Sequence, residues 1–403
     1  MNNSVSHVLN KAPVFEVDYY SDEVIRNPWP HYAAMRELGE VVYIPSLGNY
    51  AVTRYAEARA VLGNWQVFSS AQGLGGDKVG CDFFVGTSNI TNDPPLHDEI
   101  RAVMQRPLIP KAIKDFRGLI EREAAGLVER LVERGSFDGM ADLANYLPVT
   151  LVRDLVGLPE EGRENMLKWA AGAFDITGIQ NERGCKGVET VEEMHEWVVA
   201  NVTAEKAVPG SLAGRIRDMI DSGEIPTEWF LRIMNDYITP SLDTTISATG
   251  HLIYQLGRNP DQWKLLRENP LLVVGAINEA VRLNAPIRSF TRTTTCDFEL
   301  AGVLLPKGAR VMVIYASANR DERKYPDPEK YDIRRKNSDH LGFGYGIHAC
   351  IGMHLAKLEM QVLLEELIKR VDRIEVGEPT MALNNTIHAY ARLPVTFTGV
   401  AAA

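Results

Sequence analysis

The sequence lacks several features that mark common functional classes. It has 43 basic residues against 53 acidic ones, a net charge of −10, which disfavours a role in nucleic-acid binding. It contains no run of about 18 apolar residues, so we predict no membrane-spanning helix. Its first residues, MNNSVSHVLNKAPVF, have no basic start followed by an apolar run, so we expect no signal peptide. These absences predict a cytoplasmic protein.

Cysteine is scarce, and the four cysteines do not form pairs. Cys81, Cys185, Cys296 and Cys350 lie far apart in the sequence, and no Cys-x-x-Cys pair occurs. This spacing predicts neither a zinc site nor a disulfide framework, and it is typical of a protein in a reducing cytosol.

The chain also lacks an internal repeat, a low-complexity linker and any clean boundary. Its 403 residues would on length alone suggest two or three domains. Helical patterns dominate, and strand-like segments cluster in a few places. We therefore predict one domain over residues 1–403, mostly α with a small β-rich lobe. The β-rich lobe is expected at about 40–55 and 286–320 plus the C-terminal strands, and the helical lobe at about 94–283 and 340–371.

The stretch FGYGIHACIG, residues 343–352, is the strongest local signal that the sequence contains. Its glycines allow sharp turns and close approach of the backbone to a flat ligand. A helical pattern follows from Met353 to Val371, so we expect the helix dipole to lower the pKa of the Cys350 thiol. The competing interpretation is a glycine-rich turn with a buried cysteine and no ligand.

The full pattern Phe-Gly-x-Gly-x-His-x-Cys-x-Gly resembles the haem-ligand loop of the cytochrome P450 monooxygenases. The resemblance implies the cytochrome P450 fold, a triangular prism of helices around haem b. It implies that Cys350 is the axial thiolate ligand of the iron, and that Phe343 and Gly352 lie against the haem. It also implies O₂ as co-substrate and a ferredoxin-type electron donor with a reductase. A basic patch on the outer side of the loop is a candidate docking surface for that donor, with Arg101, Arg106, Lys111, His354 and Lys357 as its candidate residues, although such charges are more often plain solvated surface.

A second motif is the pair Glu279 and Arg282, which share one face of a predicted helix. Such pairs are usually exposed to solvent and worth well under ~1 kcal/mol. In the resembled family a later arginine joins the pair, and it falls at Arg335 here. The resemblance implies a structural role for the three, because they lock the segment that leads to the cysteine loop.

A third motif is Asp-Pro-Pro-x-His-x-x-x-Arg, in which His97 and Arg101 lie one helical turn apart. Both side chains can reach the same anionic group. A single histidine on a helix is more often an ordinary surface residue. The resemblance implies that His97, Arg101, Arg292 and His348 hold the haem propionates.

A fourth motif, PSLDTT at residues 240–245, interrupts a long helical pattern. Pro240 removes one backbone donor, and a threonine can bond back to a carbonyl one turn earlier, so we expect a kink. The resembled family usually has Ala-Gly where Pro240 and Ser241 stand. Asp243 and Thr244 match its acid–alcohol pair, which implies that they are catalytic and relay protons to bound dioxygen.

Several stretches resemble a narrower bacterial subgroup, the para-methoxybenzoate O-demethylases. They are residues 161–165, 241–245, 290–295 and 384–386. Phe174 and Phe290 match aromatic positions that enclose the substrate ring in that subgroup, although plain core packing is an equal alternative for each. The subgroup's carboxylate-binding arginines and serine fall at Phe84, Asn235 and Asp236, so no cation is expected to receive a benzoate.

The resemblance implies a haem-thiolate monooxygenase that oxidises a small aromatic substrate. We expect O-demethylation of a neutral methoxylated aromatic of the lignin-derived guaiacol or syringol type, with Asp236 accepting a phenol O–H. One alternative is oxidation of a para-substituted benzoate. Another is a haem-thiolate sensor without catalysis, which would use Cys350 but would not need Asp243 and Thr244.

Overall fold

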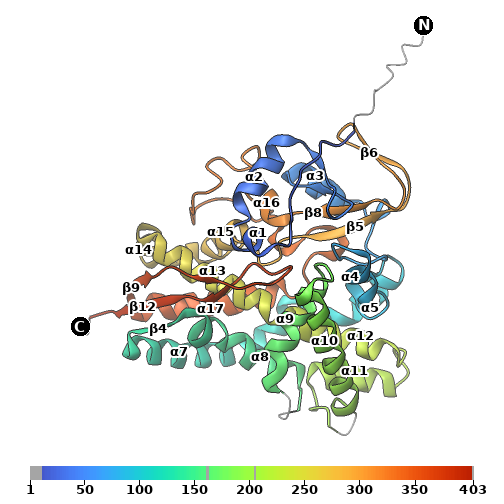
Figure 1. Ribbon diagram of the computed structural model, residues 1–403. Helices are drawn as coiled ribbons and strands as arrows, with labels where there is room; N and C mark the ends of the chain where they lie inside the picture. Colours follow the sequence, from blue (N-terminus) through green and yellow to red (C-terminus); the bar gives the residue numbers. More distant parts are fainter. Residues whose placement is uncertain (1–10, 160–162, 204–205, 402–403) are drawn as a thin grey trace.

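A computed structural model describes residues 11–159, 163–203 and 206–401 (Figure 1). The predictions for residues 1–10, and for Glu161 and Gly162 of the subgroup-like stretch, lie outside the described residues.

The largest sheet has five strands in the order β1-β2-β8-β5-β3, of which β5 and β8 are labelled below α2 and α3 in Figure 1. Its strands are β1 (Val41–Ile44), β2 (Asn49–Val52), β3 (Phe68–Ser69), β5 (Phe290–Thr294) and β8 (Arg310–Val313). β2 pairs with β8 in parallel, and the other pairs are antiparallel. The β-rich lobe expected at about 40–55 and 286–320 contains β1, β2, β5 and β8.

Three smaller sheets use the remaining strands. The hairpin β6 (Phe298–Leu300) and β7 (Val303–Leu305) extends from the large sheet. β4 (Ser136–Asp138), β12 (Pro394–Gly399) and β9 (Val371–Val376) form a sheet beside the helices, near the C-terminus (Figure 1). β10 (Thr380–Met381) pairs with β11 (Tyr390–Arg392).

Helices make up most of the described chain. They are α1 (Asp22–Arg26), α2 (Trp29–Leu38), α3 (Tyr55–Gly63), α4 (Lys78–Phe83), α5 (Leu96–Met104), α6 (Pro110–Ile113), α7 (Arg117–Arg134), α8 (Tyr146–Val156), α9 (Met166–Ile176), α10 (Glu182–Asn201), α11 (Leu212–Asp221), α12 (Trp229–Ile238), α13 (Asp243–Arg258), α14 (Pro260–Glu268), α15 (Val273–Leu283), α16 (Tyr315–Ala318) and α17 (Met353–Arg370).

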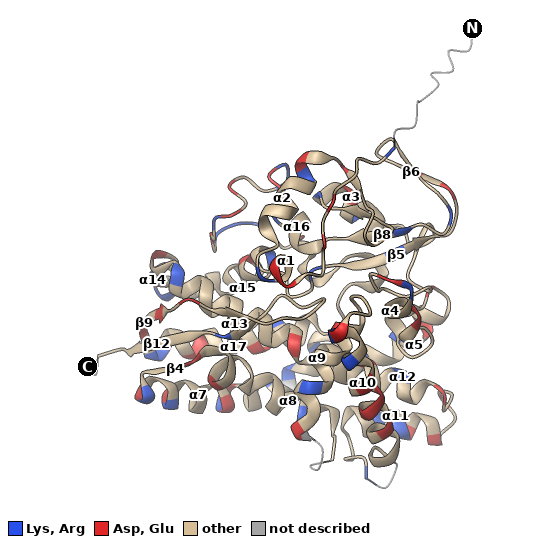
Figure 2. Cartoon of the chain, viewed as in Figure 1, with Lys and Arg blue, Asp and Glu red and all other residues tan. Residues whose placement is uncertain are grey.

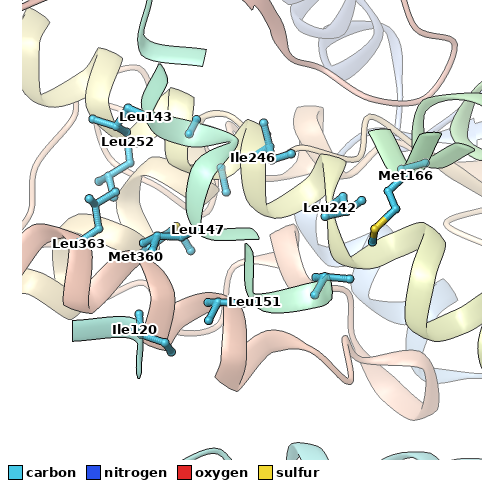
Figure 3. Packing of buried hydrophobic residues seen from close by; sticks show 14 of the residues in the cluster. Ile120, Leu143, Leu147, Leu151, Met166, Leu242, Ile246, Leu252, Met360 and Leu363 are labelled. Carbon is cyan, nitrogen blue, oxygen red and sulfur yellow. The ribbon is translucent and has the colours of Figure 1, made fainter. Parts of the chain in front are cut away.

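The main hydrophobic core lies among the long helices, where each contributes one apolar face. Figure 3 shows Leu143 and Leu252 packing near Leu363, and Leu147 near Met360. These residues come from the segment 139–144, α8, α13 and α17, so α13 and α17 pack against the same core. This core holds α13, which begins at the candidate acid Asp243, and α17, which begins just after the candidate thiol Cys350.

Charged residues lie mainly on the outer faces of the helices. Figure 2 shows acidic and basic residues interspersed along α7, at the edge of the molecule. Mixed charge of this kind is typical of a solvated face. Among the described residues, no helix is both long enough and apolar enough to cross a membrane.

The long glycine-rich stretch before residue 93 is less irregular than its sequence suggests. It contains the helix α4, whose first turn is capped because the Asp77 carboxylate accepts the Gly80 N–H at 2.8 Å. Gly73 has φ +92°, and a Cβ there would lie 2.1 Å from the carbonyl oxygen of Cys81. Glycine is therefore required because the loop folds tightly onto α4, a contact that has no periodic signal.

Candidate functional site

A large cavity lies between the five-stranded sheet and the helices, with about 2000 Å³ of empty volume when the space open to solvent is included. Its walls come from the 84–90 loop, α5, α9, α12, α13, β5, the 341–352 loop and α17. It receives most of the candidate site residues predicted from the sequence. Among its lining residues Cys350 is the only cysteine.

The 341–352 loop positions Cys350 by its backbone. The Cys350 N–H donates to the Phe343 carbonyl oxygen at 2.8 Å, which closes the loop just before α17 begins. Gly346 has φ +74°, and a Cβ there would lie 2.5 Å from the carbonyl oxygen of Leu62. The loop therefore needs glycine both for its left-handed turn and for its close contact with α3. Gly352 is the N-cap residue of α17.

The sequence predicted a lowered pKa for the Cys350 thiol, and this prediction is wrong. Burial raises the pKa of Cys350 above its ordinary value, and this effect exceeds the opposing ones. The Gly352 and Met353 amides, Arg101 and Lys357 all lower the pKa, as the helix argument anticipated. Protein groups alone therefore do not hold this thiol ionised. A coordinated metal ion deprotonates a thiol directly.

Nitrogen donors line the wall beside Cys350. His97 is buried, with its Nδ1 at 2.8 Å from the Asp98 carboxylate and its Nε2 without a hydrogen-bond partner. The His97 and His348 rings meet edge to face, 4.6 Å between centroids. Burial, then the nearby Arg292, His97 and Arg101, lowers the pKa of His348 to about 2. His348 is therefore neutral at ordinary pH, and the guanidinium groups of Arg101 and Arg292 carry positive charge beside it.

The arginines of this wall keep donors available for a ligand. Arg101 donates to the Ala349 carbonyl oxygen at 2.5 Å, and Arg292, from β5, donates to the Thr291 carbonyl oxygen at 2.8 Å. Each guanidinium has five N–H donors, so neither is saturated by these bonds. No acidic residue of the described chain forms an ion pair with Arg101 or Arg292.

The long helix breaks at the predicted position. A short 3₁₀ turn, Thr239–Ser241, separates α12 from α13. Three hydroxyls bond to carbonyls one turn earlier: Thr239 to Asn235 at 2.9 Å, Ser241 to Tyr237 at 2.5 Å and Thr244 to Pro240 at 2.8 Å. Side chains thus replace backbone bonds that the break removes.

Asp243 and Thr244 begin α13 at this break. Thr244 lines the cavity, whereas Asp243 does not and lies half-buried behind it. Burial, then the charge of Asp175, raises the pKa of Asp243 to about 7. An acid with a pKa near neutrality is suited to proton transfer at physiological pH.

Another part of the cavity lining, which we call the substrate end, is largely apolar. It includes Phe84 (at the C-terminus of α4), Phe174 (α9) and Phe290 (β5), the residues that the sequence analysis considered as substrate contacts. The polar groups Asn235 and Asp236 from α12 lie in the same wall.

Asp236 has hydrogen-bond partners that the sequence did not reveal. Its carboxylate oxygens accept the Ser88 O–H at 2.5 Å and the Asn89 N–H at 2.7 Å, and Asn235 Nδ2 lies 3.4 Å away. Burial raises the pKa of Asp236 to about 6 despite these donors. Asp236 therefore also ties the 84–92 loop to α12, a role that sequence spacing could not predict because Ser88 lies 148 positions away.

Comparisons with known proteins agree with these observations. A family model described as Cytochrome P450 matches residues 232–386. The chain is 36% identical over 388 residues to cytochrome P450 CYP199A2 of Rhodopseudomonas palustris, covering 95% of this chain and 93% of the relative. It is 32% identical to cytochrome P450-terp of Pseudomonas sp, over 76% of this chain and 75% of the relative.

The chain belongs to the cytochrome P450 family. Solved structures of other P450s share its fold. The P450 CREJ, solved with (4-ethylphenyl) dihydrogen phosphate, superposes with a TM-score of 0.82 over 93% of this chain and 98% of that one, at 25% identity. CYP109Q5 of Chondromyces apiculatus gives a TM-score of 0.82 at 24% identity, over 96% and 99%. The predicted mostly-α P450 fold is therefore confirmed.

P450 enzymes are haem b monooxygenases with a cysteine thiolate as the axial iron ligand. The cavity of this P450 fits that group, because it offers one thiol at the start of α17 and a rim of donors beside it. The buried His97 Nε2 has no hydrogen-bond partner, and a haem propionate would supply one. Arg101 and Arg292 would neutralise the propionate charge.

The Glu279, Arg282 and Arg335 side chains come together away from the cavity. Arg282 donates to both Glu279 oxygens, at 2.7 and 2.9 Å, and Arg335 Nε donates to one of them at 2.9 Å. Asn337 Nδ2 adds a fourth donor at 2.6 Å. The Glu279 and Arg282 side chains are 0% exposed, so this network is not the common solvated pair.

Sequence reasoning missed several polar residues around the cavity. Ser70 Oγ lies 2.8 Å from His348 Nε2, and the charge of Arg292 lowers the pKa of Tyr315 against the larger effect of burial, which raises it. Glu359 on α17 is buried, its Oε2 has no partner, and burial raises its pKa to about 8. Only Glu359 had a signal in the sequence, as an acid within the apolar stripe of a predicted helix.

Proposed function

We propose that this P450 oxidises a small neutral aromatic substrate, and that its reaction is the O-demethylation of a methoxylated aromatic of the guaiacol or syringol type. The observation that carries the proposal is the substrate end of the cavity. Three phenylalanines line it, and its one acid, Asp236, forms no ion pair with a described residue.

A carboxylate substrate is disfavoured at this end. A benzoate would be desolvated among Phe84, Phe174 and Phe290, with Asp236 as a like charge, and the two arginines that line the cavity, Arg101 and Arg292, are assigned to the haem propionates in this proposal. A phenol O–H is different, because Asp236 can accept it. A carboxylate has about four lone-pair sites, and Ser88, Asn89 and Asn235 occupy at most three.

The haem, when bound, supplies O₂ activation and the insertion of one oxygen atom into a C–H bond. In the proposed arrangement Cys350 holds the iron, and His97, Arg101, Arg292 and His348 hold the propionates. Thr244 and Asp243 hold and deliver the protons. The balance is ArOCH₃ + O₂ + 2e⁻ + 2H⁺ → ArOCH₂OH + H₂O, and the hemiacetal then breaks down to ArOH and formaldehyde.

A ferredoxin-type electron donor is part of the proposal. A surface hollow beside α17 is lined by Lys114, His354 and Lys357, which would face an acidic donor, and by Arg117, which already pairs with Glu121 and Glu365. Two of the basic residues considered from the sequence are otherwise engaged. Arg101 bonds to the Ala349 carbonyl oxygen, and Arg106 pairs with Glu224 at 2.6 Å.

Substrate binding tests the aromatic class directly. We expect guaiacol and syringol to give a strong high-spin shift of the haem spectrum, and para-methoxybenzoate to give a weak one. The variant Asp236→Asn removes the negative charge at nearly constant volume, so it should strengthen para-methoxybenzoate binding and weaken guaiacol binding. A strong shift with the benzoate alone in the unmodified protein would refute the proposed class.

Turnover separates the enzyme from a sensor. With NADH, a ferredoxin and its reductase, we expect one formaldehyde released for each phenol formed. A carbon monoxide spectrum of the thiolate type without any NADH-dependent product from the tested aryl ethers would favour the sensor.

A further inference from the structure

Charge is unevenly distributed over the lining of the cavity. The cations Arg101 and Arg292 lie at the thiol end, where the charges of both act on His348. The acids among the described lining residues are Asp236, at the substrate end, and Glu359, on α17. Burial raises the pKa of Glu359 to about 8, so its carboxyl is neutral near neutral pH. Asp236 is therefore the one carboxylate of this lining that carries a charge there.

Neutral donors alone hold the Asp236 carboxylate. The Ser88 O–H and the Asn89 N–H donate to its two oxygens, at 2.5 and 2.7 Å, and Asn235 Nδ2 lies 3.4 Å from one of them. These donors supply no charge, and at least one of the carboxylate's lone-pair sites stays open. Burial raises the pKa of Asp236 to about 6, so the group is still ionised at neutral pH. The folded protein thus already holds a desolvated anion at the substrate end.

The cation whose charge acts on Asp236 does not line the cavity. Arg232 lies one helical turn earlier on α12 and donates to the Gly86 carbonyl oxygen at 2.6 Å. Burial raises the pKa of Asp236, and the Arg232 charge lowers it by less. On α10, His195 Nε2 lies 3.3 Å from Asn235 Oδ1, and burial lowers the pKa of His195 below its ordinary 6.5, so that ring is neutral too. No lining residue that the structure describes supplies a positive charge at this end.

Aromatic rings share this end of the cavity with Asp236. The Phe84 carbonyl oxygen accepts the Thr91 hydroxyl at 2.9 Å, so the loop that bonds to Asp236 also fixes the position of Phe84. Phe174 and Phe290 line the same cavity. The face of an aromatic ring attracts a cation, and the gain is largest where water is excluded. A carboxylate among aromatic rings is a combination that recognises an ammonium group.

We propose that Asp236 also receives the ammonium group of a second substrate class, the methoxylated arylalkylamines, and acts as its counter-ion. The ammonium group donates one N–H to the open site on the carboxylate. Its charge favours this end of the cavity because Arg101 and Arg292 lie at the other. The reaction is the same balanced O-demethylation, with an aminoalkyl group on the ring, and it gives the aminoalkyl phenol and formaldehyde. This inference rests on the substrate end of the proposed function and adds a cationic class to it.

Three ligands of nearly equal shape and different charge isolate this contact. They are para-methoxybenzylamine, a cation at neutral pH, para-methoxybenzyl alcohol, which is neutral, and para-methoxybenzoate, an anion. Calorimetry on the haem-loaded protein at neutral pH measures their binding without turnover. We expect the amine to bind on the order of tenfold more tightly than the alcohol, and the benzoate to bind most weakly. An amine that binds no more tightly than the alcohol would overturn the proposal.

Variants show whether Asp236 causes the preference. In Asp236→Asn, which keeps an acceptor at nearly constant volume, the amine and the alcohol should bind equally. Asp236→Glu keeps the charge, so the amine should still bind more tightly than the alcohol. The control Asp82→Asn removes an exposed acid of α4 and should leave the preference unchanged. Each result is a ratio within one variant, so a loop shift that weakens every ligand does not obscure it. A preference that persists in Asp236→Asn would overturn the proposal.

The haem spectrum reports which end of the amine faces the iron. An amine held at Asp236 keeps its nitrogen away from the iron, so we expect the same high-spin shift as with the alcohol. A low-spin spectrum with a nitrogen ligand would place the amine on the iron and overturn the proposal. Failure of the proposed function would differ, because guaiacol and syringol would release no formaldehyde while the amine preference and its loss in Asp236→Asn remained.

Discussion

The Cys350 end of the cavity is positioned by backbone, whereas the Asp236 end is positioned by side chains. At the first end, a turn that requires glycine at Gly346 and the Cys350 N–H bond to Phe343 fix the thiol within a few residues of sequence. At the second, hydrogen bonds from Ser88 and Asn89 hold a loop against α12 across more than 140 residues. We therefore expect the Cys350 end to tolerate few substitutions, and we expect substitutions at the Asp236 end to alter substrate selectivity readily.

Replacing the thiol should have the largest effect. Cys350→Ser removes the proposed iron ligand, so we expect loss of the thiolate-type carbon monoxide spectrum and of all NADH-dependent product. The control Cys296→Ser changes an exposed cysteine elsewhere and should leave both intact. A thiolate-type carbon monoxide spectrum in Cys350→Ser would refute the assignment of Cys350 as the iron ligand.

Breaking the buried ion network should come next. Glu279→Gln leaves Arg282 buried without its charge partner, so we expect a loss of about 3–5 kcal/mol in the free energy of unfolding. Chemical denaturation, with haem absorbance and far-UV circular dichroism as probes, measures it.

The matched control for that network is Glu121→Gln. Glu121 pairs with Arg117 at 2.8 Å on an exposed helix face, where a pair contributes about 0–1 kcal/mol. Similar losses in the two variants would mean that the Glu279 network acts like an ordinary surface pair.

A third test uses the buried Glu359. Its folded-state pKa of about 8 lies above the ordinary value of 4.5, so the folded state binds more protons than the unfolded state between these pH values. The contribution of Glu359 to the stability of the unmodified protein should therefore fall as pH rises from about 4.5 to 8. Glu359→Gln removes this contribution and should be the more stable variant at pH 8, by a few kcal/mol, with the difference shrinking toward pH 5.

Thermal unfolding of the haem-loaded proteins at several pH values checks the Glu359 prediction. The control Glu365→Gln changes an acid on the same helix that already pairs with Arg117. An equal gain in both variants at all pH values would show that the effect does not come from burial of the Glu359 carboxyl.

The smallest effect is expected at the substrate end. Ser88→Ala removes a hydrogen bond to Asp236, and a bond to a charged group contributes about 1.5–3 kcal/mol. Part of this lost free energy should destabilise the position of the 84–92 loop and only the rest should weaken binding. We therefore expect roughly tenfold weaker guaiacol binding with an unchanged carbon monoxide spectrum.

Thr87→Ser is the control for Ser88→Ala, because it alters the adjacent residue but keeps the hydroxyl that bonds to the Phe84 carbonyl. Spectral titration of both variants measures the binding constants. If the two bind guaiacol equally well, the Ser88–Asp236 bond does not hold the pocket, and the contrast between the two ends of the cavity weakens.

Local sequence determined much of this protein. The loop around Cys350, the helix after it, the strands after Pro286 and the break at Pro240 all follow from residues close in the chain, because turns, caps and periodicity are short-range effects. The same spacing placed His97 one turn from Arg101 and Glu279 one turn from Arg282.

Only the tertiary structure decided the net direction of each pKa shift and which distant residues form hydrogen bonds. The sequence predicted a lowered pKa for Cys350 from the adjacent helix, but desolvation inside the folded protein outweighs the helix and raises it. The bonds from Ser88 to Asp236 and from Asn385 to Asp175 join residues 148 and 210 positions apart. Desolvation and long-range hydrogen bonds depend on which segments pack together, and no local pattern in the chain records that.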